Sequence, residues 1–348
     1  MKTLKVAVIG LTIGTAHIKD YMVNQNISEI VICDINEVRL NEVGEKFAIA
    51  KRYVDYKEML KVEKPDIVSV CVSNFLHKEV CIECFKAGCH VLCEKPLGRN
   101  AKESREIYNA SQEYGVKLVV NFNRRYSGEA AALKTAVDNG RLGNIYFAKT
   151  HWKRTRGVPW WFPLNNTKEK CGGGAFLDLG VHMLDLALWL CNYPKAKYVL
   201  GKTFQAVSQK EALKRGFENF DAEDMGVAMI SFENGLMLES EISWASNRET
   251  EEDEIYLRLY GDKGGAVLRL GVNEKGFTVL QKDLIVTNKA GTPVAYEIEL
   301  ADTPTVRDAF IQTVLNDTEN NTPQNAIAVS EIIDAVYQSS AEGKPVQI

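Results

Sequence analysis

The sequence has no excess of basic residues and no long apolar run. Its 348 residues include 42 Lys and Arg against 46 Asp and Glu, which gives a formal net charge of −4. This balance lacks the basic field that attracts nucleic acid, and no basic run beside an apolar helix favours a membrane surface. No uncharged apolar run reaches the ~18 residues of a transmembrane helix. We therefore expect neither nucleic acid nor a membrane as a partner.

The N-terminus also lacks the features of a signal peptide. Its apolar run, from Val6 to Ile9, is short and ends in a glycine turn instead of a small-residue cleavage site. Internal repeats and low-complexity segments are missing as well. We expect a cytoplasmic protein, and its length suffices for two domains of the usual ~100–200 residues.

Cysteine occurs eight times, in a pattern that does not favour a metal site. Cys81 and Cys84 fall in a predicted helix, whereas Cys89 precedes a strand and Cys93 lies inside it. Zinc ribbons usually place each cysteine pair in a turn. We interpret these residues as small buried hydrophobes, with zinc binding or a redox Cys-x-x-Cys as alternatives. A reducing cytoplasm would keep all eight as thiols, including Cys33, Cys71, Cys171 and Cys191.

The first 122 residues alternate short apolar runs with segments of helical periodicity, as in a parallel sheet covered by helices on both faces. Strands are predicted at 5–9, 29–34, 66–72, 90–93 and 117–121. Helices are predicted at 16–24, 37–47, 56–60, 78–87 and 101–114, the last capped by Asn100. We therefore predict an α/β Rossmann domain, doubly wound, over residues 1–122. Ligands of such sheets bind beyond the carboxyl ends of the strands.

The remaining residues, 123–348, are predicted to form an α+β domain for substrate binding and oligomerisation. The turn Glu233-Asn234-Gly235 joins strands at 226–232 and 236–243, and a second pair flanks residues 261–265. Helices are predicted at 305–317 and 326–341, after Pro304 and Pro323. The sheet of this domain is predicted to be open and mostly antiparallel.

A glycine turn follows the first predicted strand and leads into a helix. It reads Gly10-Leu11-Thr12-Ile13-Gly14, and Asp34 ends the second strand. Glycine permits a tight turn, a helix N-terminus offers N–H groups to a pyrophosphate, and an acid at the second strand accepts hydrogen bonds from a ribose. Thr12 stands where a second glycine is usual, and the loop is one residue short. The sequence still favours a dinucleotide site formed by Gly10, Thr12, Ile13, Gly14 and Asp34.

Asp34 also bears on the choice of dinucleotide. Its carboxylate would repel a 2′-phosphate, and no basic residue follows it until Arg39. The sequence therefore predicts NAD, with NADP as the alternative.

The segment 172–190 is almost wholly apolar, and its ionisable residues are Asp178, His182 and Asp185. Their spacing of i, i+4 and i+7 places them on one face of a single buried helix. Because unpaired buried charges are costly, these groups must pair internally, hold a metal or face a ligand. Gly180 in the middle of the helix indicates a close approach to its backbone. A core histidine bonded to a structural aspartate is the alternative, and Asp185 is predicted to be a structural partner.

Further motifs follow the later strands of the first domain. Asn74-x-x-His77 comes after one strand and Glu94-Lys95-Pro96 after the next. With Arg124-Arg125-Tyr126 and Gly172-Gly173-Gly174…Asp178-x-Gly180-x-His182, they resemble the signature of the glucose–fructose oxidoreductase / inositol dehydrogenase / rhizopine catabolism (Gfo/Idh/MocA) family. Segments 156–162, 261–265 and 343–346 also resemble it, so the resemblance covers essentially the whole chain. The sequence departs from the family in the short glycine loop and in Ser73, where proline is usual.

The resemblance implies an NAD(P)-dependent oxidoreductase that acts on a CH–OH group of a sugar, cyclitol or sugar derivative. Lys95, Asp178 and His182 are then the catalytic groups. It also implies homodimers or homotetramers built through the C-terminal sheet. Cofactor contacts are expected at Gly10, Thr12, Ile13, Gly14, Asp34, Ser73, Asn74, His77, Glu94 and Lys95, and substrate contacts at Lys95, Arg124, Arg156, Trp161, Asp178 and His182. No metal is expected.

These roles agree with the chemistry of alcohol oxidation. A base must accept the hydroxyl proton while hydride leaves the same carbon, and neutral imidazole suits that task, so His182 is the predicted base. A cationic Lys95 would stabilise the developing alkoxide, and Asp178 would orient the imidazole or bind a neighbouring hydroxyl. A surface lysine is the alternative for Lys95, yet a lysine before proline at a strand end is held stiffly.

The basic and aromatic residues of the second domain each have two interpretations. Arg124 and Arg125 either bind a carboxylate or phosphate or form a salt bridge between the domains. The aromatic side chains either wall a sugar-sized pocket or pack within a loop beside Pro159. They are Trp152, Trp160, Trp161 and Phe162.

Three other functions remain open. The same scaffold could use tightly held NAD for redox elimination or glycoside cleavage, without net turnover of the cofactor. Asp178, His182 and Asp185 could instead be the metal ligands of a hydrolase, although the sequence offers no other obvious ligand cluster. A non-catalytic dinucleotide sensor is disfavoured because Lys95, Asp178 and His182 are all present.

Overall fold

The computed structural model describes residues 3–160, 167–247, 254–270, 300 and 302–348. The chain divides into two compact units, the first formed by Met1–Asn121 with Pro304–Ile327 and the second by Phe122–Thr303 with Ala328–Ile348. The segment 304–327, which the sequence pattern groups with the residues after 122, belongs to the first of these compact units. Its helix buries Val306, Phe310 and Ile311, and it packs against the first unit because its apolar face has its partners there.

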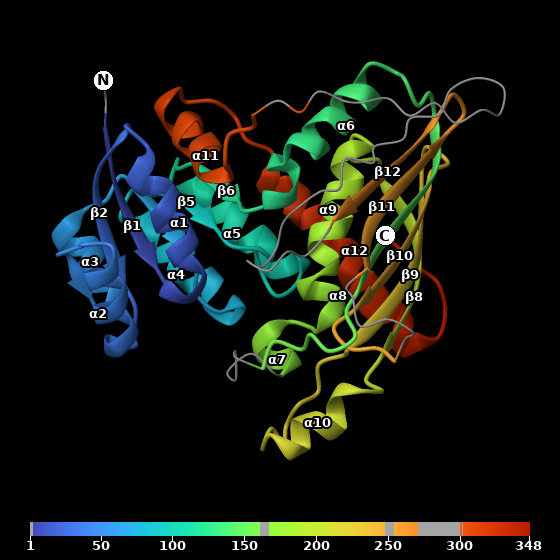
Figure 1. Ribbon diagram of the computed structural model, residues 1–348, viewed down its shortest axis with the longest axis horizontal. Coiled ribbons are helices and arrows are strands. Elements are labelled where there is room, and N and C mark those ends of the chain that lie inside the picture. Colours follow the sequence, from blue (N-terminus) through green and yellow to red (C-terminus); the bar gives the residue numbers. More distant parts are fainter. Residues whose placement is uncertain (1–2, 161–166, 248–253, 271–299, 301) are drawn as a thin grey trace. The chain divides into compact units, whose positions relative to one another are not determined.

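The first unit contains a parallel sheet of six strands in the order β3-β2-β1-β4-β5-β6. The strands are β1 (Leu4–Ile9), β2 (Ile27–Cys33), β3 (Arg52–Tyr53), β4 (Ile67–Val70), β5 (His90–Cys93) and β6 (Leu118–Val120). This order confirms the doubly wound Rossmann fold (Figure 1). The sequence analysis missed β3, which is two residues long and pairs only with the end of β2.

Most helices of the first unit alternate with its strands along the chain, and one comes from the segment 304–327. They are α1 (Leu11–Val23), α2 (Glu37–Lys46), α3 (Tyr56–Glu63), α4 (Asn74–Lys86), α5 (Ala101–Glu113) and α11 (Val306–Leu315). The sequence analysis started α1 five residues and α4 four residues too late, because glycine and polar residues there resemble a loop. Asn100 caps α5 as predicted, since its side chain accepts a hydrogen bond from the Glu103 N–H at 2.9 Å.

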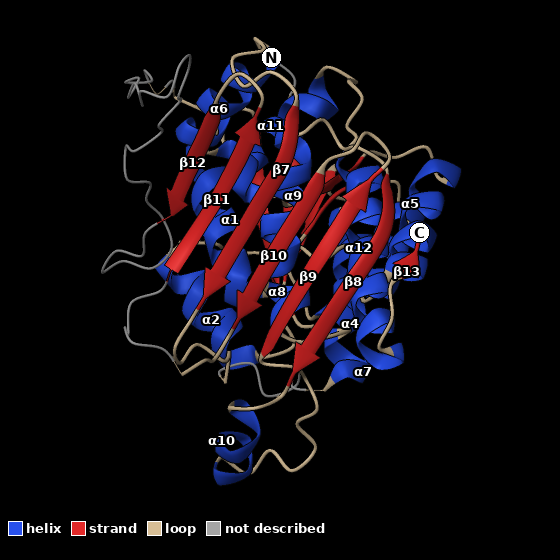
Figure 2. Ribbon diagram, turned by 90° about the vertical axis from the view of Figure 1, so that its right-hand side faces the viewer, coloured by secondary structure: helices blue, strands red, loops and turns tan. Residues whose placement is uncertain are grey.

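The second unit contains a sheet of seven strands in the order β12-β11-β7-β10-β9-β8-β13 (Figure 2). The strands are β7 (Ile145–Lys153), β8 (Ala196–Phe204), β9 (Met225–Phe232), β10 (Met237–Ser243), β11 (Glu254–Gly261), β12 (Gly265–Leu270) and β13 (Val346–Gln347). The β9–β10 and β11–β12 hairpins are antiparallel as predicted. Because only β7 and β10 pair in parallel, the sheet is mostly antiparallel.

One face of this sheet is covered by helices. The helical segments after residue 122 are η1 (Asn123–Tyr126), α6 (Gly128–Asp138), α7 (Lys168–Cys171), α8 (Ala175–Asp178), α9 (Gly180–Leu190), α10 (Ser208–Lys214) and α12 (Thr322–Glu342). Helices α8 and α9 contact β7, β9 and β10, where Trp152, Phe176 and Leu184 are buried. Among the described residues, no single helix is long and apolar enough to cross a membrane, and only the pair Lys168–Asp178 and Gly180–Leu190, bent by 50°, reaches that length and composition together.

The other face of the sheet carries exposed apolar side chains. Tyr198, Leu200 and Phe204 alternate along β8 with buried residues, and Met229 lies beside Leu200 in the register of β8 with β9. Each of the four is between 38% and 49% exposed. In the view of Figure 2, this face is turned toward the reader and none of the described helices of the second unit lies across it. We call these four residues the open-face cluster.

The cysteines are free thiols, and all but Cys191 are buried. Cys81, Cys84, Cys89 and Cys93 are among them, which agrees with their interpretation as small apolar side chains. Burial raises the pKa of the Cys89 thiol to about 12 and that of the Cys84 and Cys93 thiols well above the usual value, so these three stay protonated.

Candidate active site

The glycine turn after β1 forms a cradle at the N-terminus of α1. Gly10 has φ +89°, and a Cβ there would lie 2.5 Å from the Cys71 carbonyl oxygen, so only glycine fits. Helix α1 begins at the next residue, and its N-cap residue, Gly10, has no side chain to cap it. The cradle suits a phosphate, because uncapped N–H groups at a helix N-terminus attract anions.

The rest of the turn explains its departure from the usual glycine pattern. Gly14 lies inside α1, where a Cβ would be 2.6 Å from Val8 Cγ1, so this glycine lets the helix pack against β1. Thr12 and Ile13 are exposed in the first turn of the helix. Thr12 thus replaces the second glycine at a position with room for a side chain.

Asp34 lies beside this cradle, directly after β2. Its Oδ2 accepts a hydrogen bond from the Leu11 N–H at 2.8 Å, and its Oδ1 accepts one from the Asn36 N–H at 2.9 Å. The side chain is half-exposed. A carboxylate fixed in this way at the end of the second strand is positioned to accept hydrogen bonds from ribose hydroxyls. The residues present therefore fit the dinucleotide that the sequence predicts.

A second helix N-terminus follows β4. Ser73 is the N-cap residue of α4 and Asn74 its first residue, and both are half-buried. His77 is fully buried, with Nδ1 2.8 Å from the Pro96 carbonyl oxygen and Nε2 3.1 Å from that of Val72. Burial lowers the pKa of His77. Its ring thus joins two loops and does not face an open surface.

Glu94 and Lys95 lie at the carboxyl end of β5. Glu94 is 5% exposed, and its Oε1 accepts hydrogen bonds from His17 Nε2, at 2.9 Å, and from the Asn121 amide. Burial by itself would raise the pKa of Glu94, but these hydrogen bonds and the charges nearby lower it to about 2. The Oε2 atom accepts a hydrogen bond from the Lys95 backbone N–H at 3.2 Å. A charged, buried carboxylate thus holds the backbone of the predicted catalytic lysine, which is itself half-buried.

Asp178 and His182 lie on two helices, not on the single helix that the spacing predicts. Helix α8 ends at Asp178, Leu179 separates the two, and α9 begins at Gly180. Asp178 is half-exposed, and its Oδ2 accepts a hydrogen bond from Trp244 Nε1 at 2.9 Å. His182 is 9% exposed, and its ring centroid lies 6.0 Å from that of Trp152.

Close packing at Gly180 comes from the protein itself. A Cβ there would lie 3.4 Å from Phe176 Cδ1 and 3.5 Å from Ile242 Cγ1. The close approach that the sequence predicts at this glycine is thus made by apolar side chains.

Asp185 forms an ion pair with Arg125, and its role differs from those of Asp178 and His182. It is 1% exposed, and its Oδ2 accepts a hydrogen bond from Arg125 Nε at 2.9 Å. The Tyr193 hydroxyl donates to its Oδ1. Asp185 is therefore the structural partner that the sequence predicts. Arg125 forms its salt bridge within the second unit, whereas the sequence analysis considered one between domains.

Arg124 lies in a basic, aromatic environment beside Trp152, the ring that also lies near His182. Its guanidinium carbon is 5.1 Å from the centroid of the Trp152 ring, and that of Arg154 is 5.3 Å from the same ring. Burial, together with the charge of Arg154, lowers the pKa of Arg124 to about 10.

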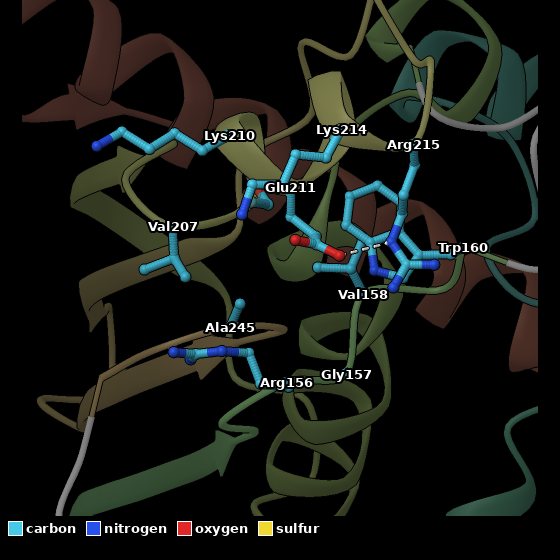
Figure 3. Close-up of a pocket in the computed structure, with 11 residues that line it drawn as sticks. Arg156, Gly157, Val158, Trp160, Val207, Lys210, Glu211, Lys214, Arg215 and Ala245 are labelled. Atoms are coloured by element: carbon cyan, nitrogen blue, oxygen red, sulfur yellow. Dashed lines mark hydrogen bonds and ion pairs between the residues drawn. The ribbon is translucent and has the colours of Figure 1, made fainter.

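Arg156 lines a pocket of about 500 Å³ (Figure 3). Val158 and Ala245 form part of its wall, and Trp160 lines it together with Arg215, which is hydrogen-bonded to Glu211 at 2.9 Å. Trp160 also stacks on Phe217 with 5.7 Å between ring centroids, so it both lines a pocket and packs within the loop. Trp161 and Phe162 lie outside the described residues. The pocket is rich in basic side chains, to which Lys210 and Lys214 also belong.

The sequence analysis gave no role to His17, Glu223 or Trp244. Glu223 is buried and accepts hydrogen bonds from the Gly174 and Phe176 N–H groups, at 2.8 and 3.0 Å, so it fixes the start of α8. Trp244 holds Asp178. No local signal singled out Glu223, since it stands among other acidic residues, Asp221 and Asp224, just before the strand that begins at Met225.

Both units match models of one protein family. A model described as oxidoreductase family, NAD-binding Rossmann fold, matches residues 4–122, and a Gfo/Idh/MocA C-terminal domain model matches residues 130–267. The chain belongs to the Gfo/Idh/MocA oxidoreductase family. This confirms the resemblance of its motifs and makes it an NAD-binding oxidoreductase.

The relatives of this family member include two dehydrogenases. D-glucoside 3-dehydrogenase of Escherichia coli (strain K12) is 32% identical over 297 residues, which cover 82% of this chain and 84% of that protein. Myo-inositol 2-dehydrogenase of Thermotoga maritima is 32% identical over 237 residues, which cover 67% of this chain and 66% of that protein.

Solved structures share the fold over the whole chain. A levoglucosan dehydrogenase in complex with NADH has a TM-score of 0.83 at 21% identity and covers 100% of this chain and 99% of its own. The aldose–aldose oxidoreductase of Caulobacter crescentus, complexed with glycerol, has a TM-score of 0.83 at 20% identity and covers 100% of both chains. These similarities support the two-part α/β architecture of the family.

Proposed function

We propose that this oxidoreductase is a dehydrogenase that oxidises a secondary alcohol of a sugar, cyclitol or sugar derivative with NAD. The observation that carries the proposal is the pair Asp178 and His182, set in a buried apolar segment of an NAD-binding oxidoreductase. A carboxylate and an imidazole set side by side in an otherwise apolar segment are typical of reacting sites. The names of the relatives, which act on a glucoside and on inositol, support the substrate class.

The cofactor would be held by the strand ends of the first unit. The α1 cradle, from Gly10 to Gly14, would bind the phosphates and Asp34 the adenosine ribose, while Ser73 and Asn74 provide a second helix N-terminus. His77 and Glu94 would act indirectly, because both are buried and hold backbone segments. When bound, the nicotinamide ring accepts the hydride that leaves the substrate carbon.

The protein's own residues would move the proton. His182 accepts the proton of the substrate hydroxyl, and Asp178, held by Trp244, orients the imidazole or binds a neighbouring hydroxyl. The Lys95 ammonium group stabilises the negative charge that develops on the alkoxide oxygen. Arg124, Arg156 and Trp161 would contact the remainder of the substrate.

A metal-dependent hydrolase is the weaker alternative. It would need Asp185 as the third ligand with Asp178 and His182, yet Asp185 is committed to Arg125 and Tyr193 in a buried network. Removing a carboxylate from such a pair would leave the Arg125 charge buried and uncompensated, which is strongly unfavourable.

The test is a screen of polyols, aldoses, cyclitols, sugar acids and glycosides for NADH formation, measured by absorbance. We expect at least one compound to be oxidised by the wild type and not by His182→Ala. Retention of NAD through purification, with substrate consumed but no NADH released, would show redox elimination or glycoside cleavage instead. Turnover that needs an added divalent ion and no NAD would contradict both.

We further propose a homodimer or homotetramer that forms through the open-face cluster of the second unit, and a cytoplasmic location, which suits eight free thiols. The four exposed apolar side chains lie together on one face of the sheet, and burial of such a face is the usual reason for self-association.

A further inference from the structure

A buried chain of hydrogen bonds runs through the first unit, from Tyr21 on α1 to Glu94 at the end of β5. The Tyr21 hydroxyl lies 2.7 Å from Ser69 Oγ, and Ser69 Oγ lies 3.0 Å from His17 Nδ1. His17 Nε2 lies 2.9 Å from Glu94 Oε1. His17, Ser69 and Tyr21 are each at most 1% exposed, so the chain is closed to water. Such groups are retained inside a protein only when every donor finds an acceptor.

The hydrogen bond between His17 and Glu94 has one consistent direction. Glu94 is ionised and can only accept, so His17 must carry a proton on Nε2 and donate it. On the other side of the ring, His17 Nδ1 contacts Ser69 Oγ, which also contacts the Tyr21 hydroxyl.

The other side of Glu94 is fixed by Asn121. Arg307 Nη1 donates to Asn121 Oδ1 at 3.3 Å, which turns the amide nitrogen of Asn121 toward Glu94 Oε1. Arg307 is in turn held by Asp20, with Nε 2.7 Å from Oδ2. Because Asp20 lies on α1 and Arg307 on α11, their ion pair joins these two helices, and Arg307 links both to Asn121 and so to Glu94.

This chain joins the two functional parts of the first unit. Helix α1 carries the nucleotide cradle at its N-terminus and His17 one to two turns later. Glu94 accepts a hydrogen bond from His17 Nε2 on one oxygen and one from the Lys95 backbone N–H on the other. A displacement of α1 would therefore reach the lysine backbone through only two side chains.

We propose that His17 is a positioning residue, which acts through Glu94 to hold Lys95 in register with the nucleotide cradle of α1. The inference rests on the proposed function for the catalytic use of Lys95, whereas the coupling itself concerns only the first unit. His17 contacts neither substrate nor cofactor in this scheme. It keeps the backbone of Lys95 at a fixed place, and errors of about 1 Å in such placement typically cost ~100-fold in rate.

The same residues could suggest a metal site, and the geometry argues against it. His17, Cys71 and Glu94 have ligand atoms within 4.8 Å of one another. Cys71 Sγ, however, lies 3.7 Å from Nδ1, whereas Glu94 lies beside Nε2 on the other side of the ring. The two ring nitrogens thus face different partners, and each is already within hydrogen-bond distance of a protein group, Ser69 Oγ for Nδ1 and Glu94 Oε1 for Nε2. Burial also raises the pKa of the Cys71 thiol well above its usual value, which disfavours the thiolate ligand.

Two substitutions of His17 separate its two hydrogen bonds. The amide nitrogen of glutamine reaches about the place of Nε2. His17→Gln therefore keeps the hydrogen bond to Glu94 and loses the contact of Nδ1 with Ser69 Oγ. Asparagine reaches about the place of Nδ1, so His17→Asn keeps the contact with Ser69 and loses the one with Glu94. If His17 acts through Glu94, the kcat of His17→Asn falls about tenfold or more and that of His17→Gln stays within about twofold, with NAD affinity nearly unchanged in both.

A second readout does not depend on turnover. In protein labelled with ¹⁵N-lysine, the Lys95 amide resonance is identified by its loss in Lys95→Arg. We expect this resonance to lie downfield, because it donates to a carboxylate, and to move in His17→Asn but not in His17→Gln or Tyr21→Phe. If no alcohol is oxidised by the wild type, the proposed function fails and this readout still tests the coupling.

The outcomes decide the inference in either direction. A Lys95 resonance that moves in His17→Asn alone, with a matching loss of kcat where an alcohol is oxidised, supports it, whereas an unchanged kcat in that variant would contradict the positioning role. Equal changes in both His17 variants, with equal loss of thermal stability, would show a merely structural histidine. One equivalent of zinc in the purified protein, lost in both His17 variants, would show a metal site and overturn the inference.

Discussion

At the scale of single residues, Asp34 decides between the two dinucleotides. Asp34→Ala removes an acceptor for the adenosine ribose and also a charge that repels a 2′-phosphate. We therefore expect NAD affinity to fall about tenfold, which corresponds to ~1.4 kcal/mol, while NADP affinity falls less or rises. Calorimetric titration of both cofactors measures this. Glu37→Ala, which removes an exposed carboxylate nearby, is the control and should change neither affinity. Equal weakening of NAD and NADP by Asp34→Ala would contradict the assignment.

The catalytic residues should separate rate from cofactor binding. Lys95→Ala and His182→Ala are each expected to lower turnover by about a hundredfold or more, because electrostatic and general-base contributions are typically ~2–4 kcal/mol. NAD affinity should change little. Lys102→Ala, an exposed lysine of α5, is the matched control for Lys95. Turnover close to that of the wild type would remove the substituted residue from the mechanism.

The pH dependence distinguishes a base from a metal ligand at His182. If the imidazole accepts the hydroxyl proton, activity rises with pH as His182 loses its proton, and this rise is absent in His182→Gln. Activity persists in a strong chelator. Asp178→Asn weakens activity without abolishing it, since the amide still accepts the Trp244 hydrogen bond but cannot stabilise the imidazolium. Loss of activity in chelator, restored by a divalent ion, would instead identify a metal site.

The buried carboxylate of Glu94 makes the first unit sensitive to acid. Its pKa is lowered to about 2 in the folded protein, below the ordinary value of 4.5. The resulting stabilisation, on the order of 3 kcal/mol, is present above the ordinary value and is lost as pH falls toward 2. The difference in melting temperature between wild type and Glu94→Gln should therefore be largest near neutral pH and shrink between about pH 5 and 3. For the exposed Glu37→Gln we expect no such trend, and a constant gap for Glu94→Gln would contradict the charged carboxylate.

At the scale of elements, the junction of α8 and α9 depends on Gly174 far more than on Gly180. A Cβ at Gly174 would lie 2.0 Å from the Glu223 carbonyl oxygen, and backbone cannot move aside cheaply. Gly174→Ala should destabilise the second unit by ~1–3 kcal/mol or more. Gly180→Ala meets its nearest atom at 3.4 Å and gains helix propensity, so it should be nearly neutral. Thermal unfolding of the two variants checks the contrast, and similar melting temperatures would contradict it.

The elements also show what local sequence determines. Strand β5 has the predicted bounds, because its short apolar run lies between Gly88 and Pro96. The break at Leu179 was not predicted, since apolar side chains continue with helical spacing on both sides of it. The break is fixed by contacts from distant residues, among them Glu223 on the Gly174 N–H. Periodicity thus identifies the element and its buried face, whereas tertiary contacts determine where its axis bends.

The same distinction explains which site residues were found. Lys95, Asp178 and His182 stand out locally, because each is ionisable and lies in or beside an apolar run. His17 was missed, since its partners Ser69 and Glu94 are 52 and 77 residues away in the chain. No local pattern shows that a histidine on the first helix will meet a carboxylate on the fifth strand.

At the scale of the whole molecule, the two-part architecture follows from the change of pattern near residue 122, but the return of 304–327 to the first unit does not. The amphipathic pattern of α11 shows that one of its faces is buried, but it does not identify the elements against which that face packs. Its partner is set by long-range contacts such as that of Arg307 with Asp20. The family resemblance fixed the type of each unit, whereas the path of the chain between them required the structure.

Self-association through the open-face cluster is the prediction that concerns the whole molecule. Leu200 and Met229 are neighbours in the β8–β9 register, so Leu200→Glu with Met229→Glu places two like charges side by side on this face. Burying those charges in an interface costs several kcal/mol. We therefore expect the Kd of the dimer or tetramer to rise about tenfold or more in the double variant. Sedimentation velocity over a range of concentrations measures the change. Leu213→Glu, an exposed leucine of α10 outside the sheet, is the control and should leave the assembly intact. A monomeric wild type, or an unchanged assembly in the double variant, would show that this face of the sheet is not the interface.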